Sequence, residues 1–178
     1  DKARNTIAKR FMDSPFDDLV MIDADVGFDL PAFSALMQAP VDIAFGLYRV
    51  KDDQLRYPGL IFDPVEHHPE TRRLIKMQNG PTGFMRIRRP VFTKMMETWP
   101  DAWYHAGEAV GKIHDFFGCG REGNHFYGED INFCRKAIEC GFDLWAVQNI
   151  NLDHTGPKTY EANWKLDILE PVKEEKAA

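Results

Sequence analysis

The sequence predicts an α/β protein with a mixed, mainly parallel sheet flanked by helices and with a small antiparallel section. The first observation is the apolar run at 19–22, which has the length of a buried strand and ends in turn residues. The second is the alternation of helical and strand-like patterns through residues 1–48, which is typical of α/β proteins. The third is the proline-punctuated stretch 49–78, which favours short antiparallel strands over long helices.

The first half of the chain follows the order helix, strand, helix, strand. Apolar residues at helical spacing predict a helix within residues 1–12. A helix is expected over 30–38, because Asp29 suits its N-cap and Pro31 its first turn. The apolar run 41–48 predicts the second strand.

The second half adds a strand, two helices and an aromatic loop. A strand after a Gly/Pro turn leads into a helix over 91–99 with a proline at its start. Residues 100–128 lack a clean period and are rich in Gly, His and aromatic side chains, which favours an ordered functional loop over a cleft. Acids in the first turn and Gly141 as a stop predict a helix over 129–140, and a strand follows over 142–147.

Composition bounds the size and the partners of the protein. With 178 residues, of which 44% are hydrophobic and 28% charged, we expect a single domain over 1–170 and a charged tail over 171–178. The net charge of -6 argues against a general basic surface, so no nucleic acid is expected as a partner. No apolar run approaches the roughly 20 residues that span a bilayer, so we expect no membrane span.

The three cysteines favour a reducing compartment. Cys119, Cys134 and Cys140 are odd in number, and no two of them form a Cys-x-x-Cys pair. This pattern suggests neither a disulfide framework nor a cysteine zinc site, so the expected location is cytoplasmic.

Two aspartates, Asp23 and Asp25, end the first apolar run and are the most informative feature of the chain. Ligands of open α/β sheets gather beyond the carboxyl ends of the strands. Two carboxylates at that place suit a divalent cation, which brings a phosphorylated substrate with it. The alternative is an Asp-rich turn that caps the next helix, although Asp29 can do that alone.

Four short motifs occur in a characteristic order. They are the Asp-x-Asp at the strand end, Gly-Phe-Met-Arg-Ile-Arg-Arg at 83–89, Gly-Glu-Asp at 128–130 and His154. From about Arg4 to Gly156 the chain therefore resembles the catalytic half of nucleotide-sugar glycosyltransferases of the GT-A fold, in particular the family 2-like group. The resemblance implies a GT-A-like sheet and metal-dependent transfer of a sugar from a nucleotide-sugar donor to a hydroxyl of a carbohydrate or another acceptor.

The resemblance implies a metal site made by the Asp-x-Asp and the late histidine. Asp25 is implied as a direct ligand, Asp23 as a ribose or metal contact, and His154 as the residue that completes the site. The implied cofactor is Mn²⁺ or Mg²⁺, and an imidazole ligand suits manganese better. The residues alone favour a polar turn residue before Gly156 over a metal ligand.

The resemblance also implies that Asp130 is the general base of an inverting reaction and that Glu129 orients the acceptor. A carboxylate can deprotonate a hydroxyl when it lies within hydrogen-bond reach and its pKa is tuned by its surroundings. The residues alone leave a second interpretation open, because acids in the first turn of a helix stabilise the helix dipole.

Further residues are expected to bind the donor or the acceptor. The resemblance implies that Arg4 and Asn5 approach the nucleotide and that Gly83 lies in a loop under the donor sugar, where a glycine allows close backbone approach. Trp103 and Tyr127 are candidates for stacking on sugar rings. The alternatives are a solvated helix surface for the first two residues, a tight turn for the glycine and core packing for the aromatic rings.

The pattern departs from this family at its start. A βαβ unit that forms the nucleotide pocket takes roughly 30 residues, yet only 22 residues precede Asp23. The expected explanations are a fragment without its N-terminal nucleotide-binding strands, a shortened homologue that recruits them from another chain in a homo-oligomer, or a protein without transfer activity. Two other functions stay open, namely a non-catalytic carbohydrate-binding or scaffold domain and a metal-dependent nucleotidyltransferase.

Overall fold

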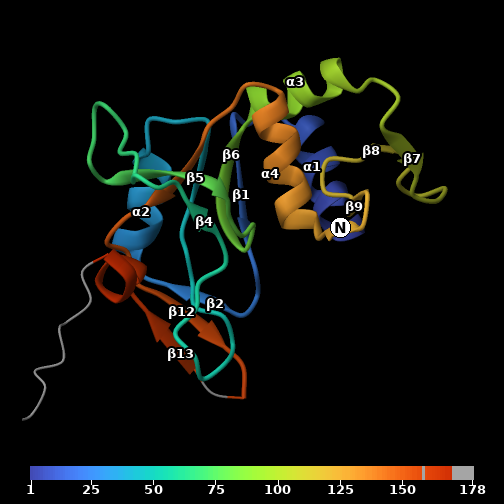
Figure 1. The fold of residues 1–178 in the computed structure, drawn as a ribbon. Coiled ribbons are helices and arrows are strands. Elements are labelled where there is room, and N and C mark those ends of the chain that lie inside the picture. The colour runs from blue at the N-terminus through green and yellow to red at the C-terminus, as the bar shows by residue number, and fades with distance from the viewer. Residues whose placement is uncertain (158, 170–178) are drawn as a thin grey trace, which may run out of the picture.

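The computed structural model describes residues 1–157 and 159–169, apart from the side chains of 166 and 167, so the expected tail over 171–178 lies outside it. The described chain forms a central six-stranded sheet and three smaller sheets (Figure 1). In spatial order, the central strands are β1 (Asp18–Ile22), β6 (Phe84–Arg88), β3 (Ile43–Phe45), β11 (Leu144–Val147), β5 (Leu74–Asn79) and β4 (Leu60–Ile61).

Helices cover both faces of the central sheet. They are α1 (Lys2–Met12), α2 (Leu30–Gln38), α3 (Arg89–Thr98) and α4 (Glu129–Glu139), and a π-helix, η1 (Lys165–Leu169), follows near the end. α1, α3 and α4 share one hydrophobic core with Ile43 of β3, whereas Leu36 of α2 packs in a second core with Ala44, the next residue of that strand. Because neighbouring strand residues point to opposite faces, the two cores lie on opposite sides of the sheet. None of the described helices is long and apolar enough to cross a membrane.

The smaller sheets are antiparallel and lie beyond the central sheet. One has the order β13 (Thr159–Ala162), β12 (Leu152–Thr155) and β2 (Val26–Phe28), and the others are the hairpins β7 (Trp103–His105) with β8 (Lys112–His114) and β9 (Gly120–Glu122) with β10 (His125–Tyr127). The stretch 100–128, in which the sequence shows no clean period, therefore contains two short hairpins.

The prediction of a mainly parallel, GT-A-like sheet is wrong. Of the five neighbouring strand pairs in the central sheet, four are antiparallel, and β3 with β11 is the parallel one. β1 and β3, which α2 connects, do run in the same direction, but β6 lies between them and is antiparallel to both. The strand–helix–strand pattern thus indicated the relative direction of two strands and not the strand that separates them.

Local signals placed α2 correctly. The helix covers Leu30–Gln38, as the sequence predicts, and the Asp29 side chain accepts a hydrogen bond of 2.7 Å from the backbone N–H of Ala32. A proline in the first turn costs no hydrogen bond there, because the first amides of a helix have no partner within it.

A buried arginine ties the central sheet to the end of α2. Arg86 of β6 is 1% exposed, and its guanidinium group donates hydrogen bonds to the carbonyl oxygens of Ala39, at 2.9 Å, and Val41. It also donates to the Asp18 carboxylate at 3.2 Å. Burial lowers the pKa of Arg86 and the charge of Asp18 acts in the opposite direction, so this ion pair offsets part of the desolvation cost.

We expect Arg86→Leu to lower the free energy of unfolding by about 3 kcal/mol, because it leaves a carboxylate and two carbonyl oxygens without their donor. Arg88→Leu is the matched control on the same strand, since Arg88 is 40% exposed and lies 3.8 Å from Asp18; its expected cost is below about 1 kcal/mol. Urea unfolding measures both variants, and equal losses would contradict a special role for Arg86.

Candidate functional site

Asp25 and His154 meet at the junction of the central and the three-stranded sheets. Asp25 lies in the turn between β1 and β2, and His154 lies on β12, opposite Val26 of β2. The backbone N–H of Thr155 donates to the carbonyl oxygen of Asp25 at 2.8 Å. As a result, Nε2 of His154 lies 3.7 Å from Oδ2 of Asp25.

The orientation of His154 is fixed from behind its ring. Nδ1 lies 2.7 Å from the carbonyl oxygen of Arg49, which can only accept, so Nδ1 carries the hydrogen. The other ring nitrogen, Nε2, then faces Asp25. Such a hydrogen bond behind the ring is the usual support of a histidine that binds a metal.

A lysine contacts the same carboxylate. Nζ of Lys51 forms an ion pair with Oδ2 of Asp25, and the two side chains are 30% and 46% exposed. The hydrogen bond from Lys51 lowers the pKa of Asp25, and the charge of His154 acts in the same direction, whereas burial opposes both. Asp25 therefore stays ionised at neutral pH.

Arg4 joins the two acidic motifs. Its Nη2 donates to both carboxylate oxygens of Asp23, at 2.9 and 3.0 Å, and its Nη1 lies 3.7 Å from Oε1 of Glu129. The backbone N–H of Asp23 also donates to the carbonyl oxygen of Gly83 at 2.9 Å. Arg4 therefore joins the turn after β1 to the start of α4, and the Asp23 backbone ties the same turn to Gly83.

Gly83 lies where two side chains approach the backbone closely. A Cβ atom at this position would lie 2.3 Å from Oη of Tyr48 and 2.6 Å from Oδ2 of Asp23, both shorter than real Cβ contacts. Burial, and then the charges of Asp23 and Asp130, raises the pKa of Tyr48. Tyr48 is thus a protonated hydroxyl beside two carboxylates, and the edge of its ring also contacts His154, with the ring centroids 4.8 Å apart.

Asp130 is the carboxyl group of the site whose pKa is raised, in contrast to Asp25. It lies in the first turn of α4, where Oδ1 accepts a hydrogen bond from the buried hydroxyl of Thr82. Burial raises its pKa above the ordinary value, against the effects of Thr82 and Arg4, and the charge of Glu129 adds to the increase. A small cavity of about 250 Å³ opens beside it and is lined by Pro58, Gly59, Asn79, Gly80, Pro81, Gly128, Glu129, Asp130 and Ile131.

The metal ligands expected from the sequence are brought together only in part. Among the residues that the structure describes, no group of three or more His, Cys, Asp or Glu side chains is arranged to hold a metal ion. Asp25 and His154 form a close pair, whereas both oxygens of Asp23 accept from Arg4. A cation at the pair would need its remaining ligands from water or from substrate oxygens.

Asn5 lies next to Arg4 but is turned toward another part of the molecule. It is 1% exposed, its Nδ2 donates to Asp115 at 2.8 Å and to Oη of Tyr104 at 3.3 Å, and its Oδ1 accepts from the N–H of Phe117 at 2.8 Å. All hydrogen-bonding groups of the amide are therefore used within the protein, and this geometry fits a structural role better than nucleotide contact.

The two aromatic candidates lie on the hairpins. Trp103 of β7 is 42% exposed, and Nζ of Lys112 lies 3.9 Å from the centre of its ring. Tyr127 of β10 is covered by the guanidinium group of Arg135, 4.1 Å from its ring centre. These cation–π contacts, rather than contacts with the acidic cluster, are what the structure places around both rings.

Three residues of the cluster were not predicted from the sequence. Tyr48 and Lys51 follow β3, and their approach to Asp23, Asp130 and Asp25 results from the path of the chain after that strand. No local pattern indicates it. Thr82 directly precedes Gly83, so its place in the same motif was the one available signal.

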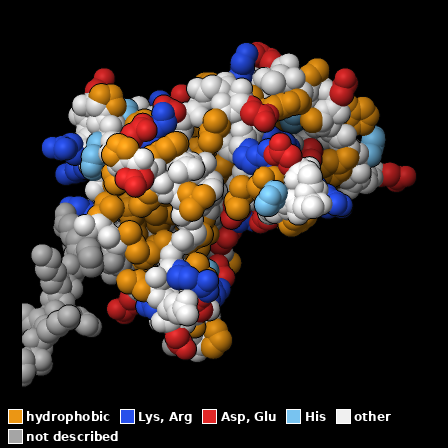
Figure 2. All heavy atoms as spheres, in the orientation of Figure 1, with side chains coloured by type: hydrophobic (Ala, Val, Ile, Leu, Met, Phe, Trp, Pro, Cys, Tyr) orange, Lys and Arg blue, Asp and Glu red, His pale blue; other side chains and the backbone are white. Residues whose placement is uncertain are grey.

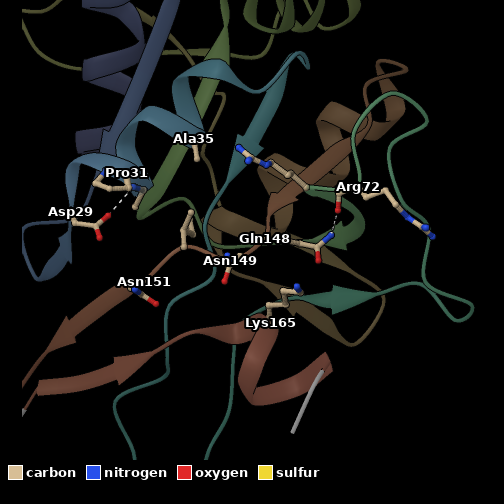
Figure 3. Close-up of a pocket in the computed structure, with 11 residues that line it drawn as sticks. Asp29, Pro31, Ala35, Arg72, Gln148, Asn149, Asn151 and Lys165 are labelled. Atoms are coloured by element: carbon tan, nitrogen blue, oxygen red, sulfur yellow. Dashed lines mark hydrogen bonds between the residues drawn. The ribbon is translucent and has the colours of Figure 1, made fainter.

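Another cavity, of about 440 Å³, lies beside α2 (Figure 3). Its wall includes Asp29, Asn149, Asn151 and Lys165, and the Gln148 amide donates to the carbonyl oxygen of Arg72 at 2.5 Å. This cavity shares no lining residue with the acidic cluster. Over the face in Figure 2, Lys and Arg side chains are interspersed with Asp and Glu, without one dominant sign.

Among the comparisons with known proteins, only those with solved structures give matches. No family model matches the chain, and no curated protein matches it. Among solved structures, the protein A197 from STIV is similar with a TM-score of 0.50 and 17% sequence identity, and the match covers 86% of this chain. The chain spans 65% of the length of A197. At this identity the similarity concerns the fold alone.

The predicted resemblance to GT-A glycosyltransferases of the family 2-like group is wrong. The neighbour A197 is a viral protein, family models give no match, and the central sheet is mostly antiparallel. The same correction applies to the N-terminal nucleotide-binding strands, whose absence was inferred from that family. Short motifs in the right order were insufficient, because acidic turns and helix starts also occur for structural reasons.

We expect Asn5→Ala to lower the free energy of unfolding by about 2 kcal/mol, because it leaves the Phe117 N–H and the Asp115 carboxylate without a buried partner. The Phe117 amide should exchange its hydrogen faster, whereas β1 amides should change only as much as global stability does. Hydrogen–deuterium exchange resolves the two regions. Asn124→Ala, at an exposed position, is the control, and unchanged exchange at Phe117 in Asn5→Ala would contradict the anchoring role.

Proposed function

We propose that this protein is a metal-dependent transferase that moves a sugar from a nucleotide-sugar donor to an acceptor hydroxyl, with inversion and with Asp130 as general base. One observation carries the proposal. Asp25 with His154, Asp23 with Arg4, and Asp130 with Thr82 come from distant segments of the chain. Arg4 also contacts Glu129, and Tyr48 contacts His154 and feels the charges of Asp23 and Asp130, so the three pairs lie in one cluster. The support is this geometry and not membership of a family.

The donor set fits a divalent cation. A carboxylate oxygen and an imidazole nitrogen 3.7 Å apart would hold Mn²⁺, or Mg²⁺ with less preference for the nitrogen. When bound, such an ion would neutralise charge on the departing diphosphate. Two protein ligands suffice if the donor phosphates and water supply the others, as magnesium sites at phosphorylated substrates often do. Arg4 holds Asp23 nearby, in the position we assign to ribose or donor binding.

Asp130 has the features of a base for a hydroxyl. Its raised pKa makes it a stronger proton acceptor than an exposed aspartate. Thr82 orients one carboxylate oxygen. The neighbouring Glu129, 3.7 Å from Arg4, would orient the acceptor. The adjoining cavity of about 250 Å³ would admit the acceptor group. Inversion follows from a single attack assisted by one base.

A scaffold or carbohydrate-binding domain is the main competing function. It accounts for the fold, but it does not account for a half-buried carboxyl group kept beside a second acid at a cavity, because such a group costs stability. A nucleotidyltransferase that uses two cations needs more carboxylates than the Asp25–His154 pair provides. We place the reaction in the cytoplasm, since Cys119, Cys134 and Cys140 are free thiols.

We expect wild-type protein to unfold at a higher temperature with Mn²⁺ and a nucleotide sugar than with either alone, because both would bind the native state. Asp25→Ala should abolish this shift and the hydrolysis of the donor. Asp153→Ala, which removes an exposed carboxylate from the neighbouring position on β12, should retain both. The measurement is a thermal-shift screen over nucleotide sugars, followed by a hydrolysis assay.

Two results of this screen count against the proposal. A Mn²⁺-dependent thermal shift that persists in Asp25→Ala would mean that the cation binds at another site. A wild-type protein that responds to no nucleotide sugar, with or without Mn²⁺, would favour the scaffold function.

The pH dependence of transfer tests Asp130. Since its pKa is raised, the acid limb of the rate profile should lie above pH 3.8, the ordinary value for aspartate. Asp130→Asn should lower the transfer rate at least roughly 100-fold without lowering the melting temperature. A carboxyl group whose pKa is raised in the native state stabilises that state at low pH, and this stability is lost as Asp130 ionises. The free energy of unfolding of Asp130→Asn should therefore increase relative to that of wild type as the pH rises.

Asp101→Asn, at an exposed position, is the control and should leave rate and stability unchanged. An Asp130→Asn variant that keeps the wild-type rate and acid limb would exclude Asp130 as the base.

A further inference from the structure

One loop contacts both members of the Asp25–His154 pair. We call the segment between β3 and β4, residues 46–59, the 46–59 loop. Its Arg49 carbonyl oxygen accepts from Nδ1 of His154 at 2.7 Å, and its Lys51 forms the ion pair with Asp25. The loop therefore both orients the imidazole and covers the carboxylate.

Lys51 contacts the very oxygen that a cation would need. Oδ2 of Asp25 is the atom in contact with Nζ of Lys51 and also the atom 3.7 Å from Nε2 of His154. An ammonium group and a divalent ion would thus compete for one carboxylate oxygen. An ion pair whose members are 30% and 46% exposed is weak, because water screens it. A doubly charged ion held by a second ligand can therefore displace it.

The loop backbone is held by hydrogen bonds close to Lys51. The backbone N–H of Val50 donates to the carbonyl oxygen of Arg56 at 2.9 Å, and the N–H of Asp52 donates to the carbonyl oxygen of Val50 at 2.8 Å. Arg56 also pairs with the Asp52 carboxylate. A lysine carries a compact charge on a flexible four-carbon stem, so the ammonium group can change position by several ångströms without moving the loop backbone.

We propose that Lys51 is a displaceable counter-ion of the metal site. It holds the Asp25 carboxylate until a divalent cation arrives, and its released ammonium group then binds the diphosphate of the donor. The proposal rests on the proposed function and adds a donor-binding residue to it. Neutralising the diphosphate from both sides would hold the donor in one orientation.

The test compares Mn²⁺ binding by wild type, Lys51→Met and Lys51→Arg. Free Mn²⁺ is measured by electron paramagnetic resonance, without any turnover. Lys51→Met should bind Mn²⁺ roughly two- to fivefold more tightly, since no ion pair must break, whereas Lys51→Arg should resemble wild type. In the presence of Mn²⁺, Lys51→Met should bind inorganic pyrophosphate several-fold more weakly, measured by calorimetry. Lys76→Met, which removes the remote pair with Asp143 at 2.8 Å, is the control and should change neither affinity.

The outcomes separate this proposal from the proposed function. If wild type binds Mn²⁺, Asp25→Ala does not, and Lys51→Met has the wild-type affinity, the metal site stands and the role of Lys51 is overturned. An unchanged affinity for pyrophosphate in Lys51→Met overturns the second half of the role. If neither wild type nor Lys51→Met binds Mn²⁺, both proposals fall.

Discussion

The antiparallel pairing of β2 with β12 is the constraint on which the acidic cluster depends. It sets Val26 opposite His154 and lets the Thr155 amide bond the Asp25 carbonyl oxygen, so the imidazole reaches a carboxylate far away in the sequence. Because side chains alternate along a strand, a shift of this register by one residue would turn His154 to the opposite face of its sheet. The pair therefore exists only while a small sheet outside the main core keeps one alignment.

Two neighbouring residues of α1 connect the site to the rest of the protein. Arg4 points toward Asp23 and Glu129, whereas Asn5, the next residue, is buried and bonds the chain around Phe117. One helix thereby fixes the distance between the acidic turn and the start of α4. The guanidinium group also lowers the cost of keeping several carboxylates together, since two of them face one positive charge.

The sequence predicted features set by local interactions and failed where distant segments decide. The N-cap of α2 and the start of α4 were correct, because Asp29 and the acids at 129–130 act on their own turns. The sheet was wrong because the place of β6 between β1 and β3 depends on pairing between segments far apart. The sequence assigns Arg4 and Asn5 the same expected role. Only the packing of α1 shows that Asn5 is a buried structural anchor and that Arg4 contacts the acidic residues. No sequence pattern predicted the contact of Lys51 with Asp25, since it results from the conformation of a loop.

The crowding around Gly83 limits how such a protein can diversify. No side chain fits between the tyrosine hydroxyl and the aspartate without displacing one of them, so this position is closed to evolutionary change while the site is in use. Variation in ligand preference must then come from surface positions such as Trp103 and Phe126 on the hairpins, whose side chains are exposed. The centre of the site would stay fixed in descendants of this chain, and its rim would drift.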